Sequence, residues 1–243
     1  GYHDACVGNG HYDTYYNAMA ERYGAPVSMK DFSDKMQLVN ANGYRGIFEA
    51  AEHKLNETGG VMLWKLNAAL PSVIWQVYDW YLDPNAGYYF MQRAVEPVHI
   101  QLNLDDSVVA VINRSYKIQN NLTANVEVYD LNSKLLFSQN KNVSLKATDV
   151  KETISVNNIL SKEQGISFVV LNLKNSLGAT LSHPESWFTP APNFKSLKDM
   201  TVAKLKATIL KTEKGKYETQ WTIQFTNTTN RIAFFINPQI VKN

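Results

Sequence analysis

The chain has 243 residues, room for one large domain or two or three small ones, and its 44% hydrophobic and 19% charged residues exclude a disordered protein. Its formal net charge is only +2 and its lysines are scattered, whereas nucleic-acid-binding proteins gather basic residues on one face, so no nucleic-acid partner is predicted. No apolar stretch approaches the roughly 18 residues that a membrane span requires.

The N-terminal segment holds a candidate cluster formed by His3, Asp4, Cys6 and His11. Cys6 is the single cysteine, so no internal disulfide is predicted and the redox compartment stays open. A thiol nucleophile or a metal site could be drawn from these side chains, but their spacing matches no zinc pattern, and no metal site is assigned. Because the first residue is Gly1 and residues 231–243 have no closing pattern, we expect the natural chain to extend beyond both ends.

The first third of the sequence predicts two helices. Residues 11–23 form the first, with Gly24 as its C-terminal residue and Pro26 just beyond. Ser28 begins the second, with Asp31 three positions later as a capping partner, and apolar residues recur at helical spacing to about Leu55.

A buried strand and a third helix are predicted next. The continuous apolar run 61–64 is typical of a strand covered on both faces in a parallel sheet, and residues 72–82 favour a helix closed by the turn 83–85. Helix, buried strand and helix follow one another as in an α/β barrel. Two acid pairs on the predicted helices could serve glycosidic acid–base chemistry, namely Glu49 with Glu52 and Asp79 with Asp83. Acids on a helix usually form a solvated face, so neither pair is assigned a catalytic role.

From Glu96 the hydrophobic period changes to two, which predicts strands. The expected strands are 98–102, 108–112, 124–129, 135–138, 153–156, 166–173 and a last one near 179–188. Short strands separated by turn residues predict an immunoglobulin-like sandwich. Residues 189–193 read as a linker, and three further strands are expected at 203–211, 217–226 and 231–236, too few to close a second sandwich.

Aromatic residues are dense between Trp64 and Tyr89. Most of them are expected to pack in a core. Trp64 differs because the apolar run gives way to a polar loop there, where an indole could cover the face of a sugar, with Asn67 hydrogen-bonding a hydroxyl. The alternative is that Trp64 fills a barrel core and Asn67 caps the loop.

Several ordered motifs resemble one branch of glycoside hydrolase family 2, the exo-β-D-glucosaminidases and mannosylglycoprotein endo-β-mannosidases. They are the run 61–67, Pro71-Ser72, Trp75-Gln76, Asp79, Asp83, Gly87-Tyr88-Tyr89 and Glu96-Pro97-Val98-His99-Ile100. The resemblance implies the C-terminal part of a (β/α)8 barrel over residues 1–95, with 61–66 as its eighth strand. An all-β immunoglobulin-like sandwich over 96–188 and a linker with an incomplete second β domain over 189–243 would follow.

The same resemblance implies a function for the intact protein. It would be a retaining glycosidase of β-linked glucosaminides or mannosides, with carbohydrate as its substrate, no cofactor, and Trp64 and Asn67 at the substrate. The two catalytic acids of the family stand on barrel strands four and seven, and no residue here matches them, so the remainder of the barrel is an expected partner. The family's polysaccharide substrates imply a periplasmic or extracellular location. The alternatives are another family 2 specificity, such as β-mannosidase or β-galactosidase, and a noncatalytic carbohydrate-binding or adhesion module.

Overall fold

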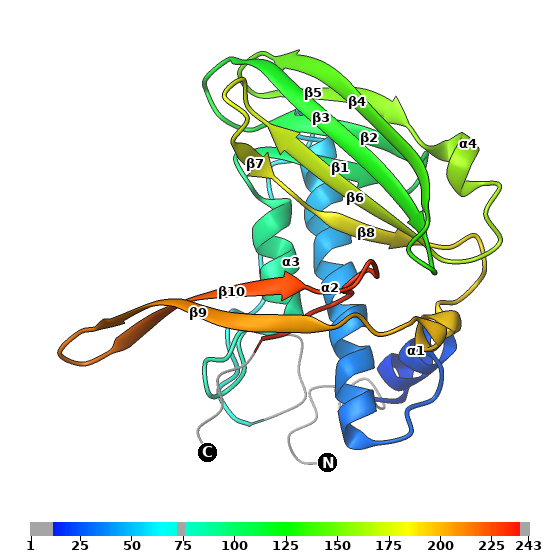
Figure 1. Cartoon of the computed structure of the whole chain (residues 1–243), viewed down its shortest axis with the longest axis vertical. Coiled ribbons are helices and arrows are strands. Elements are labelled where there is room, and N and C mark those ends of the chain that lie inside the picture. The colour runs from blue at the N-terminus through cyan, green and yellow to red at the C-terminus, as the bar shows by residue number, and fades with distance from the viewer. Residues whose placement is uncertain (1–11, 72–75, 239–243) are drawn as a thin grey trace.

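The computed structural model describes residues 12–71 and 76–238. Two β-sheets lie at one end of the molecule, helices lie beneath them, and a long hairpin projects to one side (Figure 1). The helices are α1 (Asp13–Tyr23), α2 (Met29–His53), α3 (Ala86–Ala94) and α4 (Asn157–Leu160), with a 3-10 helix η2 (Lys195–Asp199). The strands are β1 (Val98–Asn103), β2 (Val108–Asn113), β3 (Gln119–Asp130), β4 (Leu135–Leu145), β5 (Asp149–Ser155), β6 (Ser167–Lys174), β7 (Thr180–Ser182), β8 (Glu185–Phe188), β9 (Leu205–Lys214) and β10 (Thr219–Asn227).

The first two helices start and stop where the sequence predicts. Gly24 ends α1 with a φ of 86°, a left-handed value that favours glycine, and its N–H donates to the Ala20 carbonyl. At the start of α2 the Ser28 hydroxyl accepts from the Asp31 N–H at 3.1 Å, and the Asp31 carboxylate accepts from the Val27 N–H at 2.9 Å. These bonds satisfy N–H groups that the first helical turn leaves free.

Helix α3 was not predicted, because its sequence reads as part of an aromatic turn region. The Asn85 side chain accepts from the Tyr88 N–H at 3.2 Å and so begins the helix. Gly87 lets α3 approach α2 closely, since a Cβ there would lie 2.5 Å from Cδ2 of Tyr44. The Ala86 N–H also donates to Oε1 of Gln37 at 2.8 Å. These contacts hold α3 beside the long helix.

The predicted barrel strand at 61–66 is wrong, and no barrel is formed by the residues that the structure describes. A parallel strand needs neighbours on both sides to bond its N–H and C=O groups. Here the segment has a single isolated bridge nearby, in which the Tyr78 N–H donates to the Leu66 carbonyl at 3.1 Å.

The predicted helix at 72–82 is also wrong over its described part, 76–82; residues 72–75 lie outside the described residues. Oδ1 of Asp79 accepts from the N–H groups of Tyr81 at 2.8 Å and Asp83 at 2.9 Å. This local side-chain bonding offers the backbone an alternative to a helix. Asp79 and Asp83 therefore belong to one tight turn rather than to a helix face.

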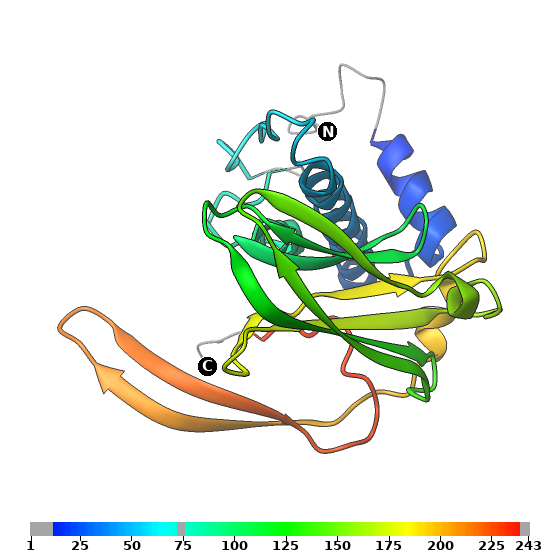
Figure 2. The same ribbon diagram turned by 90° about the horizontal axis from the view of Figure 1, so that it is seen from above.

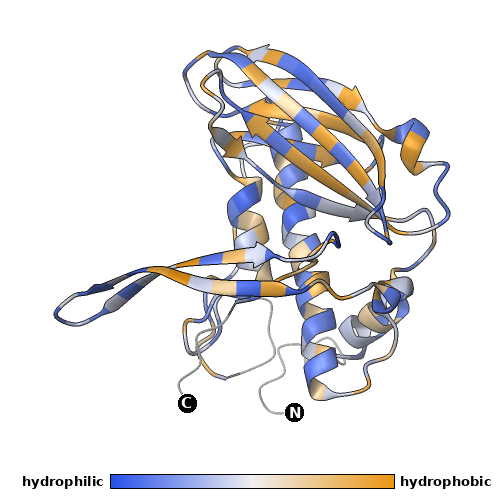
Figure 3. Ribbon diagram, viewed as in Figure 1, coloured by the Kyte–Doolittle hydropathy of each residue, from blue (hydrophilic) through white to orange (hydrophobic). Residues whose placement is uncertain are grey.

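Two antiparallel sheets pack around one apolar core at the upper end of the molecule (Figure 1). One has the order β1-β2-β5, and the other has the order β4-β3-β6-β7 with β8 also paired to β6. Hydrophobic and hydrophilic residues alternate along the strands of the second sheet, as expected when one face is buried (Figure 3). All seven strands expected between residues 98 and 188 are found, the last of them divided into β7 and β8.

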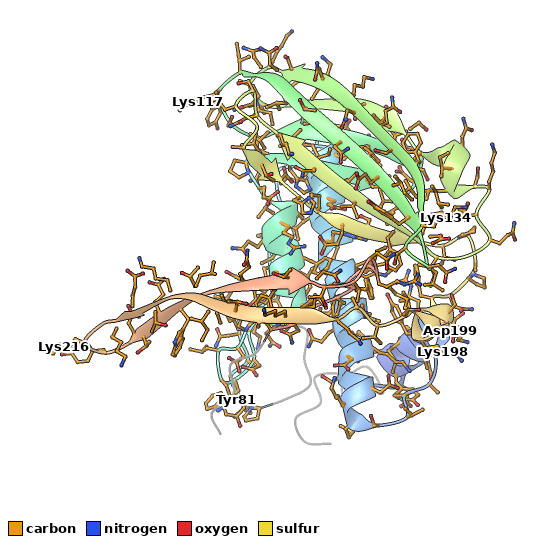
Figure 4. All side chains as sticks on the ribbon, in the orientation of Figure 1. Tyr81, Lys117, Lys134, Lys198, Asp199 and Lys216 are labelled. Carbon is orange, nitrogen blue, oxygen red and sulfur yellow. The ribbon has the colours of Figure 1, made fainter. Side chains whose placement is uncertain are left out.

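The C-terminal region forms a hairpin of β9 and β10 that extends away from the rest of the molecule (Figure 2), with Lys216 at its far end (Figure 4). Two of the three strands expected here are therefore present. The third, at 231–236, is wrong, because these residues return to the body: the Ile232 N–H donates to Oγ of Ser133 at 2.9 Å. Phe234 and Phe235 then pack around Trp187. Burying these two rings stabilises the chain more than the hydrogen bonds of a third hairpin strand would.

Candidate functional site

The Trp64–Asn67 segment lies in the part of the chain where the sequence predicts a sugar platform. The Trp64 side chain is 75% exposed, and the Nδ2 group of Asn67 donates weakly to the Ala68 carbonyl at 3.4 Å. The bridge to Tyr78 anchors the segment, and the Asn85 side chain donates from Nδ2 to the Gln76 carbonyl at 2.6 Å. The segment is thus tied through the 76–85 turn to the start of α3.

Several exposed apolar side chains lie in this segment and in the residues that follow it as far as α3. They are Met62, Trp64, Leu66, Leu70, Trp80, Tyr81, Leu82 and Tyr89, and we refer to them as the 62–89 apolar surface. Tyr81 marks its position in Figure 4, at the end of the molecule remote from the two sheets. A group of this size in one stretch of chain exceeds the scattered single apolar residues of an ordinary surface, and it indicates an interaction surface.

The second constellation is a buried polar interface between α2 and the outer face of β1. Its helix residues are Arg45, Glu49, Glu52 and His53, and its strand residues are His99, Gln101 and Asn103. Nε2 of Gln101 donates to the Glu49 carbonyl at 3.0 Å and to Oδ1 of Asn103 at 2.9 Å. The alternating polar positions of β1, which usually face solvent, are therefore covered by the helix.

His99 is the fully buried centre of this interface. Its Nδ1 lies 3.2 Å from Oε2 of Glu96 and 3.1 Å from Oγ of Ser182, and its Nε2 lies 3.7 Å from Oε1 of Glu49. Burial by itself would lower the pKa of the imidazole, but the hydrogen bonds and charges of Glu49 and Glu96 outweigh it and raise the pKa above 6.5. Two carboxylates therefore flank the His99 ring, one near each ring nitrogen.

Arginines complete the charge balance of the interface. Arg45 donates from Nη1 to the Glu185 carbonyl at 2.8 Å and from Nη2 to Oδ1 of Asn42 at 2.9 Å, and its Nε lies 3.8 Å from Oε2 of Glu49. Burial raises the pKa of Glu52, opposed by Arg114, whose Nε lies 3.1 Å from Oε2 of Glu52. These cations stabilise carboxylates that have been removed from water.

Glu49 and Glu52 therefore do not form a solvated face, and that prediction is wrong. Both carboxylates are occupied by cations of the interface, so neither is free for acid–base work on a ligand. Arg45, Gln101 and Asn103 were not predicted from the sequence to belong to any site. A usable signal was present, because charged residues at helical spacing in α2 precede alternating polar residues in β1, and buried polar positions pair with one another.

The remaining candidate groups add no site. The cluster of His3, Asp4, Cys6 and His11 lies outside the described residues. Among residues 12–71 and 76–238, no three His, Cys, Asp or Glu side chains come together in a way that could hold a metal ion. None of the helices described is long and apolar enough to cross a membrane.

We expect the stability of the chain to fall as the pH rises above neutrality because of His99. Its folded-state pKa is raised above the unfolded value of 6.5, so its contribution to the free energy of unfolding is complete below about pH 6.5 and is lost as the pH rises through the folded-state pKa. The pKa of Glu52 is also raised, so its contribution to the free energy of unfolding likewise declines as the pH rises above about 4.5.

Urea unfolding at about pH 6 and about pH 9 tests this expectation. In the His99→Gln variant the decline between the two pH values should be clearly smaller than in the wild type, since a neutral amide replaces the titrating group. Equal declines in the two proteins would show that His99 does not carry the pH dependence.

No protein-family model matches the chain, but curated proteins do. An exo-β-D-glucosaminidase of Amycolatopsis orientalis is 34% identical over 149 residues, covering 59% of this chain and 14% of that protein. One of Arthroderma benhamiae is 28% identical over 247 residues, covering 91% of this chain and 27% of that protein. A mannosylglycoprotein endo-β-mannosidase of Lilium longiflorum is 36% identical over 110 residues, covering 45% of this chain and 12% of that protein. The chain thus spans only 12 to 27% of the length of these relatives.

Solved structures give the same result. The exo-chitosanase of Amycolatopsis orientalis superposes with a TM-score of 0.86 at 25% identity, covering 94% of this chain and 30% of that one. A β-D-mannosidase from Dictyoglomus thermophilum, with a TM-score of 0.67 at 16% identity over 88% of this chain and 26% of that one, shares the fold. The chain is therefore a homologue of exo-β-D-glucosaminidases and mannosylglycoprotein endo-β-mannosidases, and it corresponds to a C-terminal part of them.

Proposed function

We propose that this chain is part of a retaining family 2 glycosidase that acts on β-linked glucosaminides or mannosides. The superposition of 94% of the chain on an exo-chitosanase carries the proposal. Such an enzyme uses two carboxylates about 5 to 5.5 Å apart, one as nucleophile and one as acid and then base, and it needs no metal or organic cofactor. A β-mannosidase specificity is the second candidate, favoured by the likeness to the Dictyoglomus thermophilum enzyme and to β-mannosidase B of Aspergillus niger.

The domain assignment is part of the proposal. Residues 1–95 would be the C-terminal part of a TIM-barrel catalytic domain, residues 96–188 an immunoglobulin-like β-sandwich, and residues 189–243 a linker and an incomplete β-sandwich. Two antiparallel sheets around one core support the middle assignment. The exposed hairpin of β9 and β10 supports the last one, since a two-stranded ribbon buries little apolar surface alone.

The 62–89 apolar surface would pack against the remainder of the barrel. Its exposed indole and aliphatic side chains would be removed from water. A periplasmic or extracellular location belongs to the same proposal, because glycosidases of polymeric substrates work where the polymers are found.

We expect the 243-residue chain alone to hydrolyse no glycoside. The acids that would attack the anomeric carbon and protonate the leaving group are not among its residues, and its buried carboxylates are paired with cations. The purified chain and a longer protein containing the barrel should be assayed against aryl β-glucosaminide, β-mannoside and β-galactoside. Turnover by the 243-residue chain that disappears in a Glu49→Gln or Asp79→Asn variant would overturn the proposal.

We expect Trp64→Ala, made in the protein that contains the barrel, to lower kcat/KM by at least about ten-fold, or about 1.4 kcal/mol of transition-state binding. Active sites of such barrels lie at the C-terminal ends of the strands, where an indole can stack on the cleaved sugar and Asn67 can bond a hydroxyl. Trp221→Ala, on the remote hairpin, is the matched control and should leave kcat/KM unchanged. Normal kinetics in a folded Trp64→Ala enzyme would exclude the sugar-platform role.

A further inference from the structure

The outer face of the β4-β3-β6 sheet carries a polar groove that the proposed glycosidase activity does not use. Its volume is about 450 Å3, and the residues lining it are Thr123, Asn125, Glu127, Asn140, Val170, Asn172, Lys174 and His183. The sheet that carries it lies toward the viewer in Figure 4, where Lys117 and Lys134 mark the two ends of β3.

Three asparagines form one cross-strand row on the floor of this groove. Asn125 of β3 pairs with Asn140 of β4 on one side and with Asn172 of β6 on the other. Asparagine is depleted in strands, where β-branched and aromatic residues pack better on a pleated surface. A row of three asparagines is therefore unusual for a sheet, and it points to a role in binding.

The hydrogen bonds of this row are incomplete. Nδ2 of Asn125 donates to Oδ1 of Asn140 at 2.8 Å, which uses one donor and one acceptor of that pair. Oδ1 of Asn172 is buried and accepts no hydrogen bond from the described part of the chain. Leaving a buried acceptor without a partner is energetically unfavourable.

We propose that this groove binds a short saccharide, independently of the catalytic site. Side-chain amides present a donor and an acceptor together, so a row of them matches neighbouring hydroxyls of a sugar, each of which also donates and accepts. The groove is also lined by side chains that can hydrogen-bond sugar hydroxyls, namely those of Glu127, Lys174 and His183. The mixed signs of these charges favour a ligand without a high charge density over a nucleic acid or a polyanion.

Binding can be tested on the 243-residue chain by NMR titration with glucosamine and mannose β-linked oligosaccharides, whose choice rests on the proposed function. We expect saturable shifts in asparagine side-chain NH2 signals with at least one of the two series. Asn172→Leu should weaken that binding at least ten-fold. Asn158→Leu, the same kind of change at an exposed position of α4 that does not line the groove, should not alter the affinity.

A wild-type chain that gives no saturable shift with either series would overturn the proposal, and so would unchanged affinity in an Asn172→Leu chain. Thermal unfolding of the variants checks that they are folded, and Asn172→Gln provides a second test at the same position if Asn172→Leu is not. Because the 243-residue chain is expected to have no turnover, failure of binding here leaves the glycosidase assay of the longer protein unaffected. Failure of that assay would likewise leave this binding result intact.

Discussion

Arg45→Leu should lower the free energy of unfolding by about 3 to 5 kcal/mol, because it leaves buried charge without its partner. The Arg45 side chain is 4% exposed and the Glu49 side chain 8%, with their charged groups 3.8 Å apart. The substitution also removes the hydrogen bonds to the Glu185 carbonyl and to Oγ of Ser186 at the start of β8. Urea unfolding of the purified chain measures the effect.

Arg93→Leu is the matched control for this experiment. Nη1 of Arg93 lies 2.6 Å from Oε1 of Glu185, but both side chains are more than 40% exposed. Water screens such a pair, so this substitution should cost at most about 1 kcal/mol. The double variant Arg45→Leu with Glu49→Leu should recover part of the Arg45→Leu loss, because no unpaired carboxylate remains at position 49. Equal losses for the two arginine variants would show that burial of the Arg45 pair is energetically unimportant.

Trp187→Ala should cost about 3 to 5 kcal/mol and release the C-terminal tail. The indole is 2% exposed and lies at the centre of a second core. It makes edge contacts with Phe90 at 5.8 Å and Phe234 at 5.2 Å, and the Arg45 guanidinium lies 5.1 Å from its ring centroid. Removing it leaves a cavity where α2, α3 and the tail meet.

Two measurements follow the effect of Trp187→Ala. Unfolding in urea reports the loss of stability, and limited proteolysis should cut residues 228–238 faster than in the wild type. Trp221→Ala is the control, since its indole on the hairpin is 42% exposed and should cost much less. If proteolysis of the tail were unchanged in a destabilised Trp187→Ala chain, the tail would be held by contacts other than this indole.

Arg45 and Trp187 also tie the helical layer to the sheets as one unit. Arg45 lies on α2 and contacts the start of β8, while Trp187 lies within β8 and contacts α3 and the tail. Because the Arg45 guanidinium lies over the Trp187 indole, the stability losses of Arg45→Leu and Trp187→Ala should not be additive in a double variant.

The sequence by itself determined the elements whose signals are local. The Ser28 cap with Asp31 and the Gly24 terminus specify α1 and α2, since the groups that start and stop a helix lie within a few residues of its ends. Alternation of apolar residues specifies the strands from Val98 to Phe188, and the ordered motifs between 61 and 100 indicate the family.

Only the tertiary structure decided what depends on partners distant in the chain. The apolar run 61–64 has the composition of a barrel strand, but a strand exists only where neighbours bond its backbone. The polar side of β1 and the acids of α2 look solvated in sequence, yet they face each other, because each satisfies charges and hydrogen bonds that burial would otherwise leave unpaired. Likewise Phe234 and Phe235 belong to no strand, and their place is set by packing against Trp187, which no local pattern in the sequence indicates.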